Sequence, residues 1–111
     1  MLDFEHEVKD GVTVVYFIGK MDTGTSPDAE KYVNQLIEAG ANNILMNFGE
    51  LDFISSTGLR LILATGKKMT GSSGKLSICS PNITVNDVLK MSGFNRMFEV
   101  FDTEDEALQS F

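Results

Sequence analysis

Three hydroxyl-bearing residues stand in a row in the middle of the chain, as Ser55, Ser56 and Thr57. They follow an apolar segment, and we expect a strand to end and a helix to begin there. The start of a helix offers free N–H groups and the positive end of the helix dipole, so it favours an anion. A phosphate ester on Ser56 would bring roughly −1.5 to −2 charges to that place. Serine and threonine are also common helix caps, and capping is the simpler interpretation of this segment alone.

The residues before this segment predict a hairpin and a helix. Residues 2–8 and 12–18 are typical of two strands that pair across a short turn. Ser26 then predicts a helix N-cap with Pro27 at the first helical position, and Gly40 predicts the end of that helix. This helix should cover one side of a sheet.

The middle of the chain predicts a buried strand and a second helix. The nearly continuous apolar run at residues 44–48 is typical of a central strand covered on both faces. We expect a turn around Gly49, followed by residues 51–54 and the hydroxyl segment. The second helix should bury four apolar residues, Leu59, Ile62, Leu63 and Met69.

The last third of the chain continues the alternation of strands and helices. We expect a break at 71–74, then a strand at 75–79 and a third helix from Ser80-Pro81 to about Gly93. A short edge strand at 98–101 should follow. The capping box Thr103–Glu106 then predicts the start of a C-terminal helix. This order predicts an α/β sandwich with an antiparallel opening hairpin and a largely parallel remainder. Residues 1–111 should form a single domain.

The charge and the cysteine content exclude several classes of function. Nine Lys and Arg residues stand among sixteen Asp and Glu residues, a net charge of −7, which disfavours nucleic acid and anionic membrane surfaces. An acidic surface suits a basic protein partner or serves solubility. Cys79 is the only cysteine, so no intrachain disulfide can form. No signal peptide and no membrane-spanning run are recognisable, and we expect a cytoplasmic protein without direct membrane contact.

The segment Ile54-Ser55-Ser56-Thr57-Gly58-Leu59 resembles the phosphorylation-site motif of STAS domains, the family of the anti-sigma factor antagonists. Residues 19–22 (Gly-Lys-Met-Asp) resemble the glycine and aspartate that follow the second strand in that family. Ser80-Pro81 and residues 91–94 resemble the boundaries of its third helix. The order and spacing of these motifs cover most of the chain. The resemblance implies a STAS-type mixed β-sheet of about four to five strands flanked by about four helices.

The same resemblance implies a switch between partners. In this family the unphosphorylated domain binds an anti-sigma factor that is also a serine kinase, and thereby releases a sigma factor. The kinase phosphorylates the serine that corresponds to Ser56 and ends the complex, and a serine phosphatase restores it. Thr57 is the second candidate acceptor. We expect the chain to act as a monomer.

The resemblance also assigns roles to the residues around Ser56. Asp22 matches an aspartate near the phosphoacceptor, although an aspartate that binds turn amides is an equally good interpretation. Gly58 permits close approach of the helix to a neighbour or a partner, although a plain packing role is the simpler interpretation. Arg60 stands where many members have glycine, and from one turn away it could reach a phosphate on Ser56, although a solvated surface arginine is the simpler interpretation. Ser55 stands where the family usually has aspartate.

Two other functions compete with the switch. The fold could serve as a STAS adaptor subunit of a membrane transport or lipid-trafficking complex without phosphorylation, and Ser55 in place of aspartate favours this alternative. An enzyme would need a catalytic constellation that the sequence lacks, since His6 is the only histidine. One histidine and one cysteine do not make a zinc site. We therefore expect no catalytic residues, no metal and no cofactor.

Overall fold

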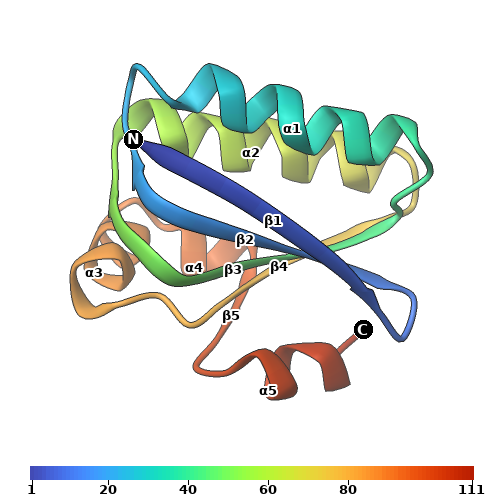
Figure 1. Ribbon diagram of the computed structural model, residues 1–111. Helices are drawn as coiled ribbons and strands as arrows, with labels where there is room; N and C mark the ends of the chain where they lie inside the picture. The colour runs from blue at the N-terminus through green and yellow to red at the C-terminus, as the bar shows by residue number, and fades with distance from the viewer.

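The structure is a computed structural model that describes residues 1–111, and it forms a five-stranded sheet flanked by five helices (Figure 1). The elements are β1 (Leu2–Lys9), β2 (Val12–Met21), α1 (Ser26–Glu38), β3 (Asn43–Ile54), α2 (Ser56–Gly71), β4 (Lys75–Cys79), α3 (Ile83–Met91), α4 (Phe94–Met97), β5 (Glu99–Phe101) and α5 (Glu104–Gln109). The strands lie side by side in the order β1-β2-β3-β4-β5. The predicted α/β class and the mixed sheet are confirmed.

The opening hairpin joins β1 and β2 in antiparallel pairing, and Lys9 pairs with Val12 at its turn. Asp10 and Gly11 form the two-residue turn, and both have positive φ angles, 53° and 79°. Such turns match the right-handed twist of two antiparallel strands. All other neighbouring strands pair in parallel, as expected for strands connected through helices.

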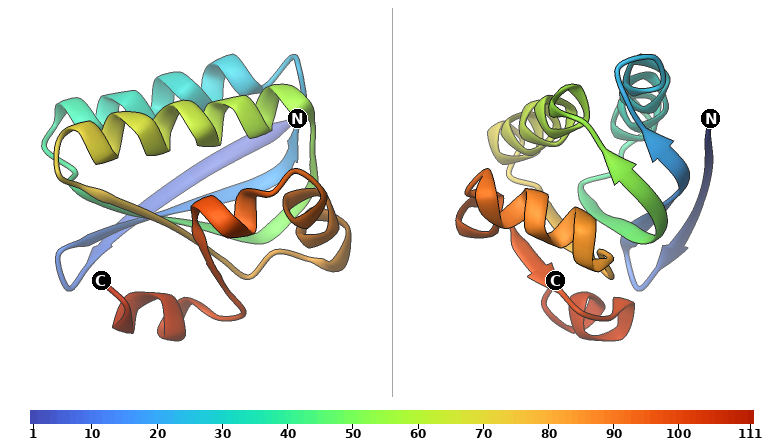
Figure 2. Two further views of the ribbon diagram at one scale, coloured as in Figure 1. Left: turned by 180° about the vertical axis from the view of Figure 1, so that it is seen from behind. Right: turned by 90° about the vertical axis from the view of Figure 1, so that its left-hand side faces the viewer.

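The two faces of the sheet carry cores of different size, because side chains of a strand alternate between its faces. Val15 and Phe17 of β2 point into a core of 18 buried residues that also contains buried residues of α1, α2, α3 and α4. Val14, between them in the sequence, points into a core of five buried residues beneath α5. Figure 2 shows α5 by itself on the side of the sheet away from α1 and α2. The short C-terminal helix is therefore the only helix that covers the second face.

The central strand β3 differs from the prediction. We expected a turn around Gly49, but β3 runs without interruption from Asn43 to Ile54. Between the pairs Tyr16–Asn47 and Ile18–Glu50, β3 advances three residues while β2 advances two. This extra residue is a β-bulge, a feature that a glycine inside a strand often marks. The bulge keeps β3 paired with β2 as far as the start of α2.

Two helices begin at residues other than those predicted. The cap of α1 is Thr25, and Ser26 is the first helical residue, buried and donating its hydroxyl hydrogen to the Asp22 carbonyl oxygen at 2.6 Å. The cap of α3 is Asn82, whose side chain accepts a hydrogen bond from the Val85 amide at 2.7 Å. The prediction that Ser80-Pro81 begins this helix was wrong.

The reason lies in the backbone of Ser80. Its φ angle is 60°, outside the helical region, and its amide donates to the Phe101 carbonyl at 2.9 Å. Because of this hydrogen bond to the end of β5, the helix cap is Asn82, two residues after the predicted cap Ser80. At the other end of α3, a separate helix of four residues, α4, was not predicted.

The buried face of α2 is also shifted from the expected one. Ile62 and Met69 are buried as predicted, whereas Leu59 and Leu63 are half-buried at the edge of the core. Leu61, which the prediction omitted, is only 3% exposed. With 16 residues α2 is the longest helix, and no helix of the structure is both long and apolar enough to cross a bilayer.

Candidate functional site

Two parallel strands end side by side at the candidate site. Met21, the last residue of β2, pairs with Ile54, the last residue of β3. The next amide, that of Ser55, donates to the Met21 carbonyl oxygen at 2.8 Å. The loop that begins with Asp22 therefore lies next to the start of α2, at the left of Figure 1. The structure thus brings together the two segments that the sequence singled out.

Ser55 caps α2. Its backbone is extended, with φ −93° and ψ 173°, and its side-chain oxygen accepts a hydrogen bond from the Gly58 amide at 3.3 Å. This geometry is the ordinary one for a serine N-cap. The family's usual aspartate would cap equally well, so the replacement by serine preserves the start of the helix.

Ser56 is the first residue of α2, and its side chain is exposed. Its hydroxyl makes no side-chain hydrogen bond within the chain, in contrast to that of Ser55. The amides of the first helical turn have no partners inside the helix, and they favour an anion near this hydroxyl. Ser56 is therefore free to accept a modifying group without breaking an existing contact.

Thr57, the second candidate acceptor, is less accessible. It is half-buried, and its hydroxyl oxygen lies 3.4 Å from that of Thr23 in the loop after β2. A phosphate on Thr57 would have to displace this neighbour. The accessibility of the two hydroxyls therefore favours Ser56.

Asp22 organises the loop that faces the start of α2. Its Oδ1 atom accepts hydrogen bonds from the amides of Gly24 and Thr25, both at 3.0 Å, and lies 3.2 Å from the Thr25 hydroxyl oxygen. The Thr25 amide, followed by the Thr25 hydroxyl and the Gly24 amide, holds the pKa of Asp22 below its ordinary value. Asp22 is thus a charged turn-forming residue, as the simpler interpretation expected, and its Oδ2 atom has no partner within the chain.

Thr25 is the residue of this loop that the sequence analysis missed as part of the site. Its hydroxyl accepts a hydrogen bond from the Asp22 amide at 2.9 Å and donates to the Lys20 carbonyl oxygen at 2.9 Å. The loop is therefore held in one shape beside Ser56. An aspartate followed by glycine and threonine two and three residues later is a recognisable turn signal, and it would have identified the loop.

Gly58 is held between the ends of the two strands. A Cβ atom at this position would lie 2.8 Å from Cγ1 of Ile54 and 3.0 Å from Sδ of Met21. Only a residue without a side chain lets the first turn of α2 sit this close to the sheet. The geometry shows the packing role of Gly58, and this role sets the position of Ser56.

Arg60 lies one helical turn after Ser56 and is exposed. The structure has three salt bridges, and their cations are Lys9 and Lys75, so Arg60 has no carboxylate partner. Residues four apart on a helix share a face, so Arg60 and Ser56 lie on the same side of α2.

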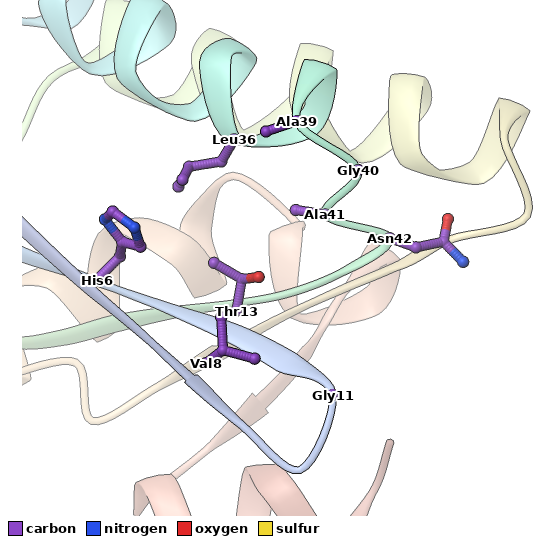
Figure 3. A pocket seen from close by; sticks show the side chains of 9 residues that line it. All are labelled: His6, Val8, Gly11, Thr13, Leu36, Ala39, Gly40, Ala41 and Asn42. Carbon is purple, nitrogen blue, oxygen red and sulfur yellow. The ribbon is translucent and has the colours of Figure 1, made fainter.

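The surface around Ser56 has no hollow. The structure contains four hollows of about 190 to 440 Å³, and none is lined by Asp22 or by residues 55–60. One of them lies between the hairpin and the end of α1, where His6 and Leu36 face each other (Figure 3). No group of three or more His, Cys, Asp or Glu side chains lies together as a metal ion requires. The candidate site therefore suits the surface of a protein partner better than a small molecule.

The sequence pattern of the STAS domain family matches residues 3–107. The chain belongs to the STAS domain family. Among its relatives, the anti-sigma F factor antagonist of Paenibacillus polymyxa is 30% identical over 96% of this chain and 92% of its own length. BtrV of Bordetella bronchiseptica is 28% identical over 92% of this chain and 88% of its own length. The STAS domain described here thus stands among the anti-sigma factor antagonists, a family of regulatory binding proteins.

Solved structures show the same fold. SpoIIAA of Bacillus in its unphosphorylated form superposes on the domain with a TM-score of 0.82 at 23% identity, covering 99% of this chain and 95% of SpoIIAA. SpoIIAA in its phosphorylated form gives a TM-score of 0.74, covering 97% of this chain and 98% of SpoIIAA. The expected STAS-type fold is therefore confirmed.

Proposed function

We propose that the STAS domain binds an anti-sigma factor through the surface around Ser56, and that phosphorylation of Ser56 ends this binding. The observation that carries the proposal is the environment of Ser56, an exposed hydroxyl without a partner on the first turn of α2. A phosphate there adds roughly 1.5 to 2 negative charges near the charged Asp22. Burying this dianion in an interface costs desolvation and repels carboxylates of the partner, which explains how the switch would work.

The proposal includes the chemistry of the partners. The anti-sigma factor would itself be a serine kinase, and a serine phosphatase would restore the unphosphorylated domain. The names of the relatives support the first partner in its general form, and the existence of a phosphorylated form of SpoIIAA supports the modification. Because sigma factors act on RNA polymerase, the proposal places the domain in the cytoplasm.

The test combines phosphorylation and binding. The purified domain is incubated with ATP and an anti-sigma factor kinase from the same organism, and the site of phosphate is read by peptide mass spectrometry. Affinity for the kinase is then measured by calorimetry for the native domain, its phosphorylated form, and the variants Ser56→Ala and Thr57→Ala. Thr57→Ala is the matched control, because it removes the neighbouring hydroxyl.

We expect phosphate on Ser56 alone, no phosphate on Ser56→Ala, and normal phosphorylation of Thr57→Ala. The phosphorylated domain should bind at least about tenfold more weakly, since a buried unpaired charge costs well over 1 kcal/mol. Phosphate on Thr57, or equal affinity of both forms, would contradict the switch.

Arg60 allows a second test of the same site. If its guanidinium group pairs with the phosphate, phosphorylated Arg60→Ala should be less stable than the phosphorylated native domain by about 0.3 to 1 kcal/mol, as for other exposed ion pairs on helices. The unphosphorylated forms should differ much less. Lys67→Ala, which removes a cation two turns further along α2, is the control. Equal stability of the two phosphorylated forms in urea would exclude this role for Arg60.

The alternative function is an adaptor subunit of a membrane transport or lipid-trafficking complex. Ser55 in place of the usual aspartate favours it, because the sequence recognised by a kinase is altered. Co-purification decides between the two: a kinase-like partner supports the switch, and an ATP-binding transport subunit supports the adaptor. A domain that no candidate kinase phosphorylates, although it is folded, would also favour the adaptor.

A further inference from the structure

A groove of about 440 Å³ runs along the C-terminal half of α2, away from the Ser56 surface. Its other wall is formed by the end of α4 and the residue that follows it. In Figure 2, α2 lies above the orange segment that contains α4 in both views. The residues that line the groove include Leu63, Gly66, Lys67, Thr70, Met97 and Phe98.

Apolar and basic side chains both line this groove. Phe98 packs against Gly66, where a Cβ atom would collide with its ring, and both residues line the groove. Met97 is 54% exposed at the edge, and a methionine there can adapt to the shape of a partner. Lys67 lines the groove and is exposed, and Arg96, the residue before Met97 in the sequence, is exposed as well. Neither takes part in a salt bridge.

The charge of the chain is divided sharply along its sequence. Residues 60–98 contain six of the nine Lys and Arg residues and only Asp87 of the sixteen Asp and Glu residues, a formal charge of +5. The rest of the chain has three basic and fifteen acidic residues, a formal charge of −12. Glu99, which lines a neighbouring hollow of about 190 Å³, is paired with Lys75 at 3.0 Å. The segment of the chain that supplies every residue lining the groove therefore carries an excess of basic residues, although the chain as a whole is acidic.

We propose that this groove docks an acidic amphipathic helix of a partner protein. An apolar side chain of that helix would insert between Leu63 and Met97, and its carboxylates would face Lys67 and Arg96. Helices commonly bind apolar grooves in this way, with anchors spaced three and four residues apart. Complementary charge selects the partner and speeds its approach, whereas basic proteins are repelled by these lysines and arginines. None of the residues that line this groove belongs to the Ser56 surface.

The test uses a designed probe and the full-length chain. A fluorescent helical peptide of about 14 residues carries Leu on one face and Glu on the other, and its affinity is measured by anisotropy. A second peptide has the same Leu face with Lys in place of Glu. Vesicles of phosphatidylglycerol provide a third probe. The variants are Lys67→Glu and Met97→Asp, and the control is Lys31→Glu, which makes the same charge change at an exposed position of α1.

We expect the acidic peptide to bind and the basic peptide to bind at least about fivefold more weakly, with the difference reduced at high salt. Lys67→Glu and Met97→Asp should each weaken binding about threefold to tenfold, and Lys31→Glu should leave it within about twofold. Ser56→Asp should not change it, which separates this proposal from the switch. Equal binding of both peptides, equal effects of Lys67→Glu and Lys31→Glu, or binding of vesicles without binding of the acidic peptide would overturn the proposal.

Discussion

Ser55, Ser56 and Thr57 are neighbours in the sequence, and each hydroxyl has different surroundings. Ser55 caps the helix, Thr57 lies against Thr23, and only Ser56 is left exposed without a partner. Serine therefore has a structural role at position 55 and is free for modification at position 56. This division follows from the cap, because the residue after an N-cap is the first helical residue and points away from the strand end.

The cap itself leads to a prediction at Ser55. Ser55→Ala removes the acceptor for the Gly58 amide and should destabilise the domain by about 1 kcal/mol, the usual loss for an N-cap. Ser55→Asp restores the family's usual residue, keeps the cap and adds a negative charge at the helix start, so it should be as stable as the native domain or slightly more stable. Urea unfolding followed by circular dichroism measures both. An Ala variant as stable as the native domain would show that the 3.3 Å hydrogen bond contributes nothing.

Gly58 leads to a prediction about packing. Gly58→Ala places a Cβ atom against Ile54 and Met21, and we expect a loss of about 1 to 3 kcal/mol, as for other overpacked sites. Gly71→Ala, at the other end of α2, is the control, because a Cβ atom there meets nothing within 4 Å. That variant should be at least as stable as the native domain, since alanine favours helix. Equal stability of the two variants would disprove the close approach at Gly58.

At the scale of elements, one side chain of α5 ties this helix to three strands of the sheet. Glu104 accepts hydrogen bonds from Lys9 Nζ at 2.7 Å, Tyr16 Oη at 2.8 Å and Asn47 Nδ2 at 3.0 Å. Burial raises the pKa of Glu104, but the hydrogen bonds from Lys9, Tyr16 and Asn47 outweigh it and leave the pKa below its ordinary value of 4.5. The carboxylate thus joins α5 to β1, β2 and β3.

Glu104→Gln should therefore destabilise the domain at neutral pH by about 1 to 2 kcal/mol, because a charge-assisted group is replaced by a neutral one. A carboxyl group with a lowered pKa stabilises the fold above its ordinary pKa, and this contribution is lost as the pH falls through 4.5 to the lower folded value. The difference between the native domain and the variant should be full at pH 7 and smaller at pH 3. Urea unfolding at both values measures it, with Asp105→Asn on the same helix as the control. A difference that is independent of pH would exclude the charge of Glu104 as its cause.

The order of the elements could be predicted from the sequence, because apolar periodicity and turn residues mark strands and helices separately. The predictions that were wrong concern features that depend on contacts between distant segments. Gly49 was interpreted as a turn because the pairing that makes it a bulge, between β2 and β3, is not visible in either segment alone. Ser80-Pro81 has the sequence pattern of a helix start. The hydrogen bond from the Ser80 amide to the Phe101 carbonyl, which the sequence does not reveal, explains why the helix begins after Asn82 instead.

The candidate site was also predicted only in part. Ser55 and Ser56 were identified from a local motif, and Asp22 joined them through the resemblance to the family. Thr25 was missed, because its importance comes from the loop that it closes with Asp22 and Lys20. The groove between α2 and Met97 combines residues about 30 positions apart in the sequence, so no local pattern predicts it.

At the scale of the whole molecule, the two cores should differ in stability. The larger core joins four helices, whereas the smaller one depends on α5, a helix of six residues. Cys79 lies in the smaller core and is fully buried, and burial raises the pKa of its thiol to about 11. Reaction of this thiol with a disulfide reagent therefore requires that α5 open first, because regions with few apolar contacts open before the rest of a protein.

The labelling rate of Cys79 tests whether the smaller core is less stable than the larger one. In native buffer at pH 8, Glu104→Gln should label about 5 to 30 times faster than the native domain, which corresponds to the loss of 1 to 2 kcal/mol at the α5 contact. Asp105→Asn should label within about twofold of the native rate. Below the unfolding transition the rate should depend only weakly on urea, because opening α5 exposes little surface, while global unfolding exposes much more. A rate that rises with urea as steeply as global unfolding does would mean that both cores open together, and that α5 is as stable a part of the fold as the four helices on the opposite face.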